Sequence, residues 1–353
     1  MDRRKFLKGC IKFISGILLL GCLTGCGVSG KEQSKDFMAM DTIMSIRCTG
    51  KEAQEALEAC EAEVHRLDSL LSTGESTSEV SAIHQGKTMP LSDDVWRLLQ
   101  QSQNLYQQTD GAFDITVYPL MEDWGFPTGD FHVPSEEQLN QAKSLCDGSQ
   151  VNLNERDHTL TLGQGQKIDF GAIAKGYTSD RLVGILMEKK VDSAFLSLGG
   201  NVYCYGTKPD GSLWKVGIRN PFLSMASAET AKEEEAMAGV LSVADTAVVT
   251  SGSYIRYFTD EETGKVYHHI MDPATGYSAD NELVSVTIVC GNGALADGLS
   301  TACFIMGVEK TISYWRQYRE IFDFVLITKD RKVYVTKSLQ SSFETQWECT
   351  VVE

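Results

Sequence analysis

The sequence predicts an α+β protein, in which strands come in runs with helices between them, and not a doubly wound parallel fold. Stretches with strand patterning fill most of the chain, amphipathic helical patterns separate them, and no repeat or long low-complexity segment appears. Beyond an N-terminal leader of 25 residues, about 328 residues remain, enough for one large domain or two modest ones. We expect mixed sheets packed with helices, in a single large domain of two subregions.

The first half of the chain predicts one strand followed by three helices. Residues 38–48 alternate between apolar and polar side chains, as in a strand, and residues 51–71 place apolar side chains at helical spacing. A second helix begins after Ser92, which is a natural N-cap with two aspartates behind it. A third begins after Ser135, where Gln138 can complete a capping box.

The second half predicts mostly strands. Residues 151–162 form two strands around a polar turn, and residues 167–177 lead into a helix. A helix over 293–306, closed by Gly307, follows later. Residues 225–238 break the pattern and are expected to form an exposed insertion. Further strands are expected over residues 194–206, 213–221, 239–252, 264–273, 283–290, 324–327 and 333–336.

The N-terminus has the pattern of an export signal. Arg3-Arg4 precedes an apolar run that is too short to span a membrane comfortably, and the order resembles a twin-arginine signal. Leu23-Thr24-Gly25-Cys26 looks like a lipobox, with Cys22 as a weaker second candidate and an uncleaved signal anchor as the alternative. We expect a signal peptide over 1–25, lipidation of Cys26, a tether over 26–36 and a location on the extracytoplasmic face of the membrane.

The net charge disfavours nucleic-acid binding, and the cysteine spacing gives no zinc-site pattern. The leader carries a balance of +4, so its removal takes the formal net charge from −16 to −20, which disfavours binding of nucleic acid through its phosphates. Contact with the membrane is then expected through the acyl anchor alone. The seven cysteines after Cys26 show neither a CxxC pair nor zinc-ligand spacing. Several of them lie in apolar patterns, where cysteine behaves as a small hydrophobe, and seven such thiols in an exported protein suggest a weakly oxidising environment.

The helix over 293–306 contains the most informative pair of polar residues. Asp297 and Thr301 lie one turn apart on the same face, where a carboxylate and a hydroxyl can offer two oxygens to one hard cation. Magnesium suits such a partial set of ligands, because it retains waters and accepts substrate phosphates. The alternative is an ordinary capping pair or solvated face. Small neighbours leave room for a close approach: Ala294, Ala296, Gly298 and Ser300.

Two glycine-containing stretches are weaker signals. "DFGAIAKGY" (169–177) places backbone amides at a helix start, which favours an anionic group, and Lys175 either reaches a phosphate or is solvated. Neither GxGxxG nor GxxxxGK[ST] is present. In "SLGGNVYCYG" (197–206) the adjacent glycines indicate either a bulge or a binding loop.

"HHIMDPATGY" (268–277) pairs two histidines with a turn. His268 and His269 should point to opposite faces of a strand, so at most one of them faces a site, and a core or surface role is the alternative. Asp272-Pro273 with Thr275-Gly276 is a turn signal in its own right. From the residues alone, a cation-and-phosphate site is plausible, but no reaction is specified.

The order of the motifs is more specific than any one of them. Taken together over residues 37–330, they resemble the ApbE family, exported flavin transferases that split FAD and attach FMN to a protein. The resemblance implies an ApbE-like, T-fold-related domain over 37–350. The motifs are "AMDT" (39–42), "GAFDIT" (111–116), "DFGAIAKGY", "LGGN" (198–201), "WKVGIRNP" (214–221), "TSG" (250–252), "HHIMDPATGY" and "ADGLSTA" (296–302).

The resemblance implies a reaction and a set of residues. A threonine or serine hydroxyl of an acceptor protein, such as a redox-pump subunit, would attack FAD bound with magnesium, and AMP would leave. His269 would assist deprotonation of that hydroxyl or orient the phosphates. The implied ligands of the cation are Asp297, Thr301 and the backbone carbonyl of Ala172, with Ser300 nearby. The implied FAD contacts are Met40, Ala112, Phe113, Asp114, Asp169, Lys175 and Ile270.

The sequence departs from the family pattern at a few positions. Gly74 follows Ser72-Thr73, where some members place an aromatic residue, and Asp41 occupies a position at which members differ. Asp41 lies in a region that can influence whether FAD is transferred or hydrolysed. Two alternatives to a transferase therefore stay open: a magnesium-dependent FAD pyrophosphatase that releases free FMN, and a lipoprotein that binds FAD without reaction.

Overall fold

The fold is built on one nine-stranded mixed sheet. The structure, a computed structural model, describes residues 32–353, so the expected signal peptide, Cys26 and the first part of the tether lie outside the described residues. Neighbouring strands of the sheet are antiparallel except the last pair, which is parallel. In spatial order the strands are β1 (Glu32–Ala39), β2 (Thr42–Thr49), β5 (Ser193–Leu198), β6 (Asn201–Tyr205), β9 (Thr246–Gly252), β12 (Leu283–Cys290), β13 (Phe322–Thr328), β14 (Val333–Thr336) and β16 (Cys349–Val352).

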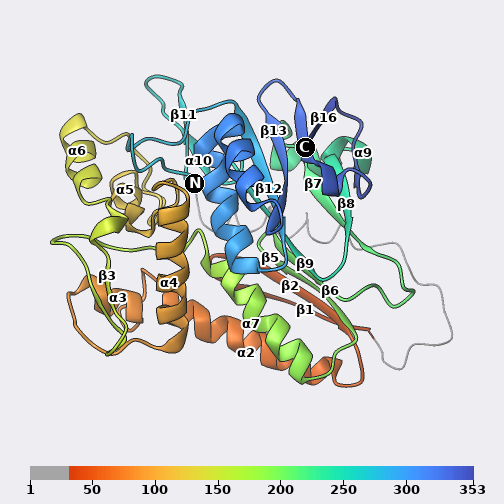
Figure 1. Cartoon of the computed structure of the whole chain (residues 1–353). Helices are drawn as coiled ribbons and strands as arrows, with labels where there is room; N and C mark the ends of the chain where they lie inside the picture. Colours follow the sequence, from red (N-terminus) through yellow and green to blue (C-terminus); the bar gives the residue numbers. More distant parts are fainter. Residues whose placement is uncertain (1–31) are drawn as a thin grey trace.

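The two faces of this sheet have different covers. Because side chains alternate along a strand, Val249 and Ile288 face a core shared with helices, whereas Val248 and Val289 face a second, smaller core. The helices α2 (Ala53–Leu71), α7 (Ala174–Glu188) and α10 (Gly293–Tyr318) pack on the first face. A three-stranded sheet of β7 (Trp214–Arg219), β8 (Met237–Val243) and β15 (Phe343–Glu344) covers the second (Figure 1). This layering confirms the α+β class.

Shorter elements surround the sheet. A separate aromatic cluster around Trp124 and Phe126 packs against a two-stranded hairpin. That hairpin, β10 (Tyr257–Thr259) and β11 (Val266–His268), lies at the top of the view in Figure 1. The other elements are α3 (Glu79–His84), α4 (Asp93–Gln108), η1 (Ile115–Val117), α5 (Tyr118–Asp123), α6 (Glu136–Ser144), η2 (Gly148–Gln150), β3 (Asn152–Asn154), β4 (Thr159–Thr161), α8 (Met225–Thr230), α9 (Glu233–Ala236) and η3 (Lys337–Leu339).

The helix-start signals were read correctly from the sequence. The Ser92 hydroxyl accepts a hydrogen bond from Val95 N–H at the start of α4. Ser135 and Gln138 form the predicted capping box at the start of α6. The helical pattern over 51–71 is α2, with its apolar positions buried. These starts were predictable because a cap depends only on residues three or four positions apart.

Two predictions near the N-terminal end of the described chain are wrong. Residues 38–48 form a hairpin and not one strand, because Met40 and Asp41 both adopt positive φ, 47° and 57°, and turn the chain between Ala39 and Thr42. The second error concerns the tether, since β1 already begins at Glu32. Its polar side chains suit an edge strand with one solvated side, and this composition resembles that of a linker.

Two more boundaries differ in the second half. Gly307 breaks the helical geometry with φ 77°, but the chain resumes the helix and α10 continues to Tyr318. The segment 225–238 folds into two short, largely exposed helices, although Ala228 and Ala236 are buried and its last two residues already belong to β8.

The seven cysteines of the described chain are all free, and five of them are buried as small apolar side chains. Between residues 32 and 353, no helix is both long and apolar enough to span a membrane.

Candidate active site

The site is organised where α7 crosses α10 at a glycine contact. A β-carbon on Gly176 would lie 2.1 Å from the Gly293 carbonyl oxygen, and one on Gly293 would lie 2.6 Å from the Gly176 carbonyl oxygen. Only glycine at both positions lets the two backbones approach this closely. The small residues of α10 thus admit neighbouring helices, because a β-carbon on Gly298 would likewise meet Leu105 of α4.

This crossing places Asp297 at the N-terminal end of α7. The Asp297 carboxylate accepts a 2.8 Å hydrogen bond from Gly176 N–H, and the residue is 6% exposed. Burial raises the pKa of Asp297, while the charge of Lys175 and the Gly176 N–H oppose that rise. The helix-start amides of "DFGAIAKGY" therefore do attract an anion, and in this structure that anion is a carboxylate of the protein itself.

The residues around Asp297 fit a hard cation. Thr301 lies one turn further along α10 and is half-buried, and its hydroxyl oxygen is 3.4 Å from the Ser251 hydroxyl oxygen. Since Gly176 N–H is directed to Asp297, no backbone N–H of the described residues donates to the Ala172 carbonyl. A carboxylate, a hydroxyl and a free carbonyl are the oxygen donors that magnesium prefers. Residues 32–353 contain no cluster of three His, Cys, Asp or Glu side chains, so such a site relies on this single carboxylate.

Ser300 is placed differently from Thr301. It is fully buried, its hydroxyl donates to the Asp297 carbonyl oxygen at 2.8 Å, and its oxygen lies 2.7 Å from the Ser251 hydroxyl oxygen. Ser300 therefore ties α10 to β9 next to the proposed cation site.

A second carboxylate, Asp169, lies at the turn before α7. It accepts a hydrogen bond from Gly171 N–H at 2.9 Å, and the Lys175 ammonium donates to the Gly171 carbonyl at 3.3 Å. Burial raises the pKa of Asp169, and Gly171 N–H, Lys175 and Arg256 lower it. Lys175 also lowers the pKa of Asp297, so its ammonium group stabilises the ionised form of both carboxylates.

The two adjacent histidines have different environments. Buried His268 uses both ring nitrogens, because Nε2 bonds to the Ala279 carbonyl at 3.1 Å and Nδ1 accepts from Ile270 N–H at 3.3 Å. Half-buried His269 bonds through Nδ1 to the Arg256 carbonyl at 3.1 Å. A carbonyl can only accept, so Nδ1 carries the proton and Nε2 keeps a free lone pair. His269 is the histidine that can accept a proton.

The charges around His269 keep it neutral in the free protein. Burial lowers the pKa of His269 to about 3, and the positive charges of Arg256 and Lys175 add to this effect. Lys175 thus acts on Asp169, Asp297 and His269 alike. The structure therefore brings these four predicted residues together from α7, α10 and the segment after β11.

The remaining predicted residues are positioned mainly through backbone. Met40 occupies the strained hairpin turn, where its N–H donates to the Asp68 carboxylate at 2.9 Å and its sulfur lies 3.9 Å from the Thr178 hydroxyl of α7. Ile270 is 3% exposed and its carbonyl accepts from Ala279 N–H.

The 112–114 stretch forms the turn after α4. Phe113 is buried beneath Gly298, and Ala112 is half-buried. The Asp114 carboxylate accepts from Thr116 N–H, the Thr116 hydroxyl and Gly148 N–H, so these three donors fix the turn. Asp114 consequently acts here as an organiser of backbone.

Four residues that the sequence interpretation did not assign also belong to this region. Asp180 of α7 accepts from Gly293 N–H at 2.6 Å and Ala294 N–H at 2.9 Å, and so caps α10 as Asp297 caps α7. The other three are Ser251, which contacts Thr301, Arg256, which acts on His269, and Asn201, which acts on Asp297. The motifs "TSG" and "LGGN" could have pointed to Ser251 and Asn201, but no local signal identifies Asp180 or Arg256, because their partners are distant in sequence.

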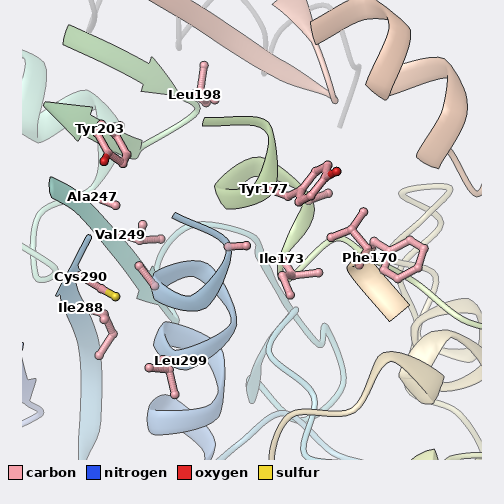
Figure 2. Packing of buried hydrophobic residues seen from close by; sticks show 14 of the residues in the cluster. Phe170, Ile173, Tyr177, Leu198, Tyr203, Ala247, Val249, Ile288, Cys290 and Leu299 are labelled. Carbon is pink, nitrogen blue, oxygen red and sulfur yellow. The ribbon is translucent and has the colours of Figure 1, made fainter. Parts of the chain in front are cut away.

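The main core fixes these elements against one another. Figure 2 shows Ile173 and Tyr177 of the α7 region in the same buried cluster as Leu299 of α10 and Val249 of β9. The site therefore stands on the two helices and the central sheet. Rigid elements of this kind hold functional groups more accurately than surface loops.

Known proteins share this sequence and this architecture. A family model described as "ApbE family" matches residues 40–325. The FAD:protein FMN transferase of Treponema pallidum (strain Nichols) is 31% identical over 350 residues, which cover 92% of this chain and 93% of that protein. One from Klebsiella pneumoniae (strain 342) is 33% identical over 284 residues, covering 79% and 84%.

Solved structures agree with the sequence comparisons. The ApbE protein of Thermotoga maritima superposes with a TM-score of 0.80 at 26% identity, covering 88% of this chain and 99% of that one. The apo flavinyl transferase ApbE of Pseudomonas stutzeri gives a TM-score of 0.73 at 27% identity, covering 90% and 95%. With a family model spanning most of its length and relatives above 30% identity, this chain belongs to the ApbE family.

Proposed function

We propose that the protein is a magnesium-dependent FAD:protein FMN transferase, which moves FMN from FAD onto a threonine or serine hydroxyl of an acceptor protein and releases AMP. The observation that carries the proposal is the meeting of Asp297, Lys175 and the free nitrogen of His269 in one site. The names of its relatives, given above, support FAD as the flavin donor.

The cation would be held by the Asp297 carboxylate, the Thr301 hydroxyl and the Ala172 carbonyl. A bound magnesium ion would neutralise the negative charge on the FAD phosphates. Lys175 adds a second positive charge at the same place. Phosphoryl transfer depends mainly on such positioning and charge stabilisation.

His269 would act on the acceptor hydroxyl. Arg256 fixes the ring through Nδ1, so Nε2 is available to take the hydroxyl proton. The hydroxyl oxygen then bonds to the phosphorus of the FMN half, and the bond from that phosphorus to the oxygen of the AMP half breaks. The anionic phosphates of FAD should raise the depressed pKa of His269 toward the working pH, which strengthens it as a base at the step where it is needed.

The cellular setting is part of the same proposal. A lipid anchor at Cys26 would hold the enzyme on the extracytoplasmic face of the membrane, within reach of exported or membrane-bound acceptors such as redox-pump subunits. The export signal in the first 25 residues and the lipobox pattern support this location. The negative net charge that remains after the leader disfavours electrostatic attachment to anionic headgroups.

An assay of the acceptor separates the candidate activities. The purified protein is incubated with FAD, magnesium and a candidate acceptor domain, and the acceptor is weighed by intact mass spectrometry while AMP is quantified. A mass gain of one FMN, matched by AMP and abolished by a chelator, is the expected result. AMP with free FMN and an unmodified acceptor, for every acceptor tried, would indicate a pyrophosphatase. Bound FAD without AMP would indicate a binding protein.

A further inference from the structure

Asn201 carries a buried amide that has no hydrogen-bond partner. The residue is 3% exposed, and among the described residues neither its amide nitrogen nor its amide oxygen finds a partner. Buried polar groups in native proteins are nearly always paired, because an unpaired one destabilises the fold by about 1–3 kcal/mol. The cost of leaving this amide unpaired therefore suggests that it has a functional role.

The backbone at Asn201 is firmly held. It is the first residue of β6, paired with Leu198 of β5 on one side and Val249 of β9 on the other. The two-residue turn before it consists of Gly199 and Gly200, both with positive φ, and a β-carbon on Gly199 would meet Thr42 at 2.5 Å. The chain cannot readily shift to give the amide another partner, because the sheet fixes the backbone of Asn201.

The amide lies on the same face of the sheet as the proposed cation site. Asn201 is directly opposite Val249 of β9, whose side chain belongs to the core shared with α10, and directly opposed residues point to the same face. Asn201 also lowers the pKa of Asp297, although no hydrogen bond of full geometry joins the two side chains in this structure. Gly176 N–H donates a 2.8 Å hydrogen bond to one oxygen of the Asp297 carboxylate. A donor without an acceptor thus stands beside a carboxylate that can accept more hydrogen bonds.

We propose that Asn201 is a positioning residue for Asp297: when a divalent cation binds, the Asn201 amide nitrogen donates to the carboxylate and holds it in the cation-binding orientation. This inference rests on the metal dependence in the proposed function. Asparagine suits the role because it is a neutral donor. An aspartate would repel Asp297, and a leucine would fill the same volume without directing it.

The test measures magnesium affinity and stability without FAD or acceptor. We expect Asn201→Leu, which nearly preserves shape, to bind Mg²⁺ roughly tenfold more weakly by calorimetric titration, because a hydrogen bond to a charged group is lost. The same variant should melt at the same temperature or a few degrees higher without metal, because an unpaired buried amide is removed. Asn201→Asp should move the onset of Mg²⁺ binding to higher pH, because two carboxylates would share protons.

Ser102 provides a matched control. Its hydroxyl on α4 is also buried without a partner among the described residues, and it has no place in the proposed site. Ser102→Ala should leave Mg²⁺ affinity unchanged. An Asn201→Leu variant that binds Mg²⁺ as tightly as the natural protein, whatever its stability, would overturn the positioning role alone. Failure of the natural protein to bind Mg²⁺ would overturn the proposed metal dependence together with it.

Discussion

The two ends of the site are built in different ways. At the α7–α10 crossing, two glycines bring backbones into contact and a buried carboxylate takes a helix-start amide. At the end formed by the β10–β11 hairpin, a half-buried histidine is held by a single carbonyl next to exposed Arg256. The crossing is suited to binding a cation and phosphates in a fixed place, whereas the hairpin end leaves a nitrogen open to a group that arrives from outside.

The largest expected effect separates the two adjacent histidines. His269→Ala should slow FMN transfer by about 10²–10⁴-fold, because the acceptor hydroxyl loses its base, with little change in melting temperature. His268→Ala should instead lower the free energy of unfolding by about 2–3 kcal/mol, because Ile270 N–H and the Ala279 carbonyl lose their partner. Thermal melts and single-turnover transfer rates on both variants check this; equal stability losses would refute the distinction.

The next effect compares the two carboxylates that cap each other's helices. Asp297→Ala should reduce transfer by about 10²–10³-fold and weaken magnesium-dependent FAD binding, because the cation loses its carboxylate. Asp180→Ala should leave transfer within about tenfold but destabilise the protein by about 1–2 kcal/mol, because Gly293 and Ala294 lose their cap. FAD binding with and without chelator, measured beside denaturant unfolding, distinguishes them. Stronger loss of FAD binding in the Asp180 variant would contradict the assignment.

A pair of glycines in α7 tests the close approach of the helices. Gly176→Ala should destabilise the protein by about 1–3 kcal/mol and reduce FAD binding, because the new β-carbon would strike the Gly293 carbonyl. Gly184→Ala, where no atom lies within 4 Å, should stabilise the same helix by about 0.5–1 kcal/mol. If Gly176→Ala were as stable and as active as the natural protein, the crossing would not be as tight as described.

The smallest effect is a pH dependence. A base works when deprotonated, so activity persists above its pKa and is lost as the pH falls through it. Since the pKa of His269 is lowered to about 3 in the free protein, kcat/KM for FAD should show no acid limb from this group between pH 5.5 and 7.5. Bound phosphates raise that pKa, so any acid limb of kcat should lie at higher pH. An acid limb of kcat/KM near pH 6.5, absent in His269→Ala, would contradict this.

The sequence predicted local features better than contacts between distant segments. The helix starts at Ser92 and Ser135 depend on residues within one turn, and they were predicted correctly, as was the helix that carries Asp297 and Thr301. The hairpin turn was missed because it contains no glycine or proline and its first positive φ value falls on Met40, a residue that rarely adopts one. The capping of α10 by Asp180 could not be predicted from the sequence, because its partners Gly293 and Ala294 lie more than 110 residues away.

Intact-mass spectrometry of an acceptor protein, for the natural protein, Asp297→Ala and His269→Ala, tests the central claim most directly when FAD binding is measured on the same samples. We expect the natural protein to add FMN with magnesium, Asp297→Ala to lose both binding and transfer, and His269→Ala to bind FAD but leave the acceptor unmodified. Transfer by His269→Ala at the natural rate, or magnesium-dependent FAD binding of natural strength in Asp297→Ala, would contradict the division of the site into a cation end and a proton-accepting end.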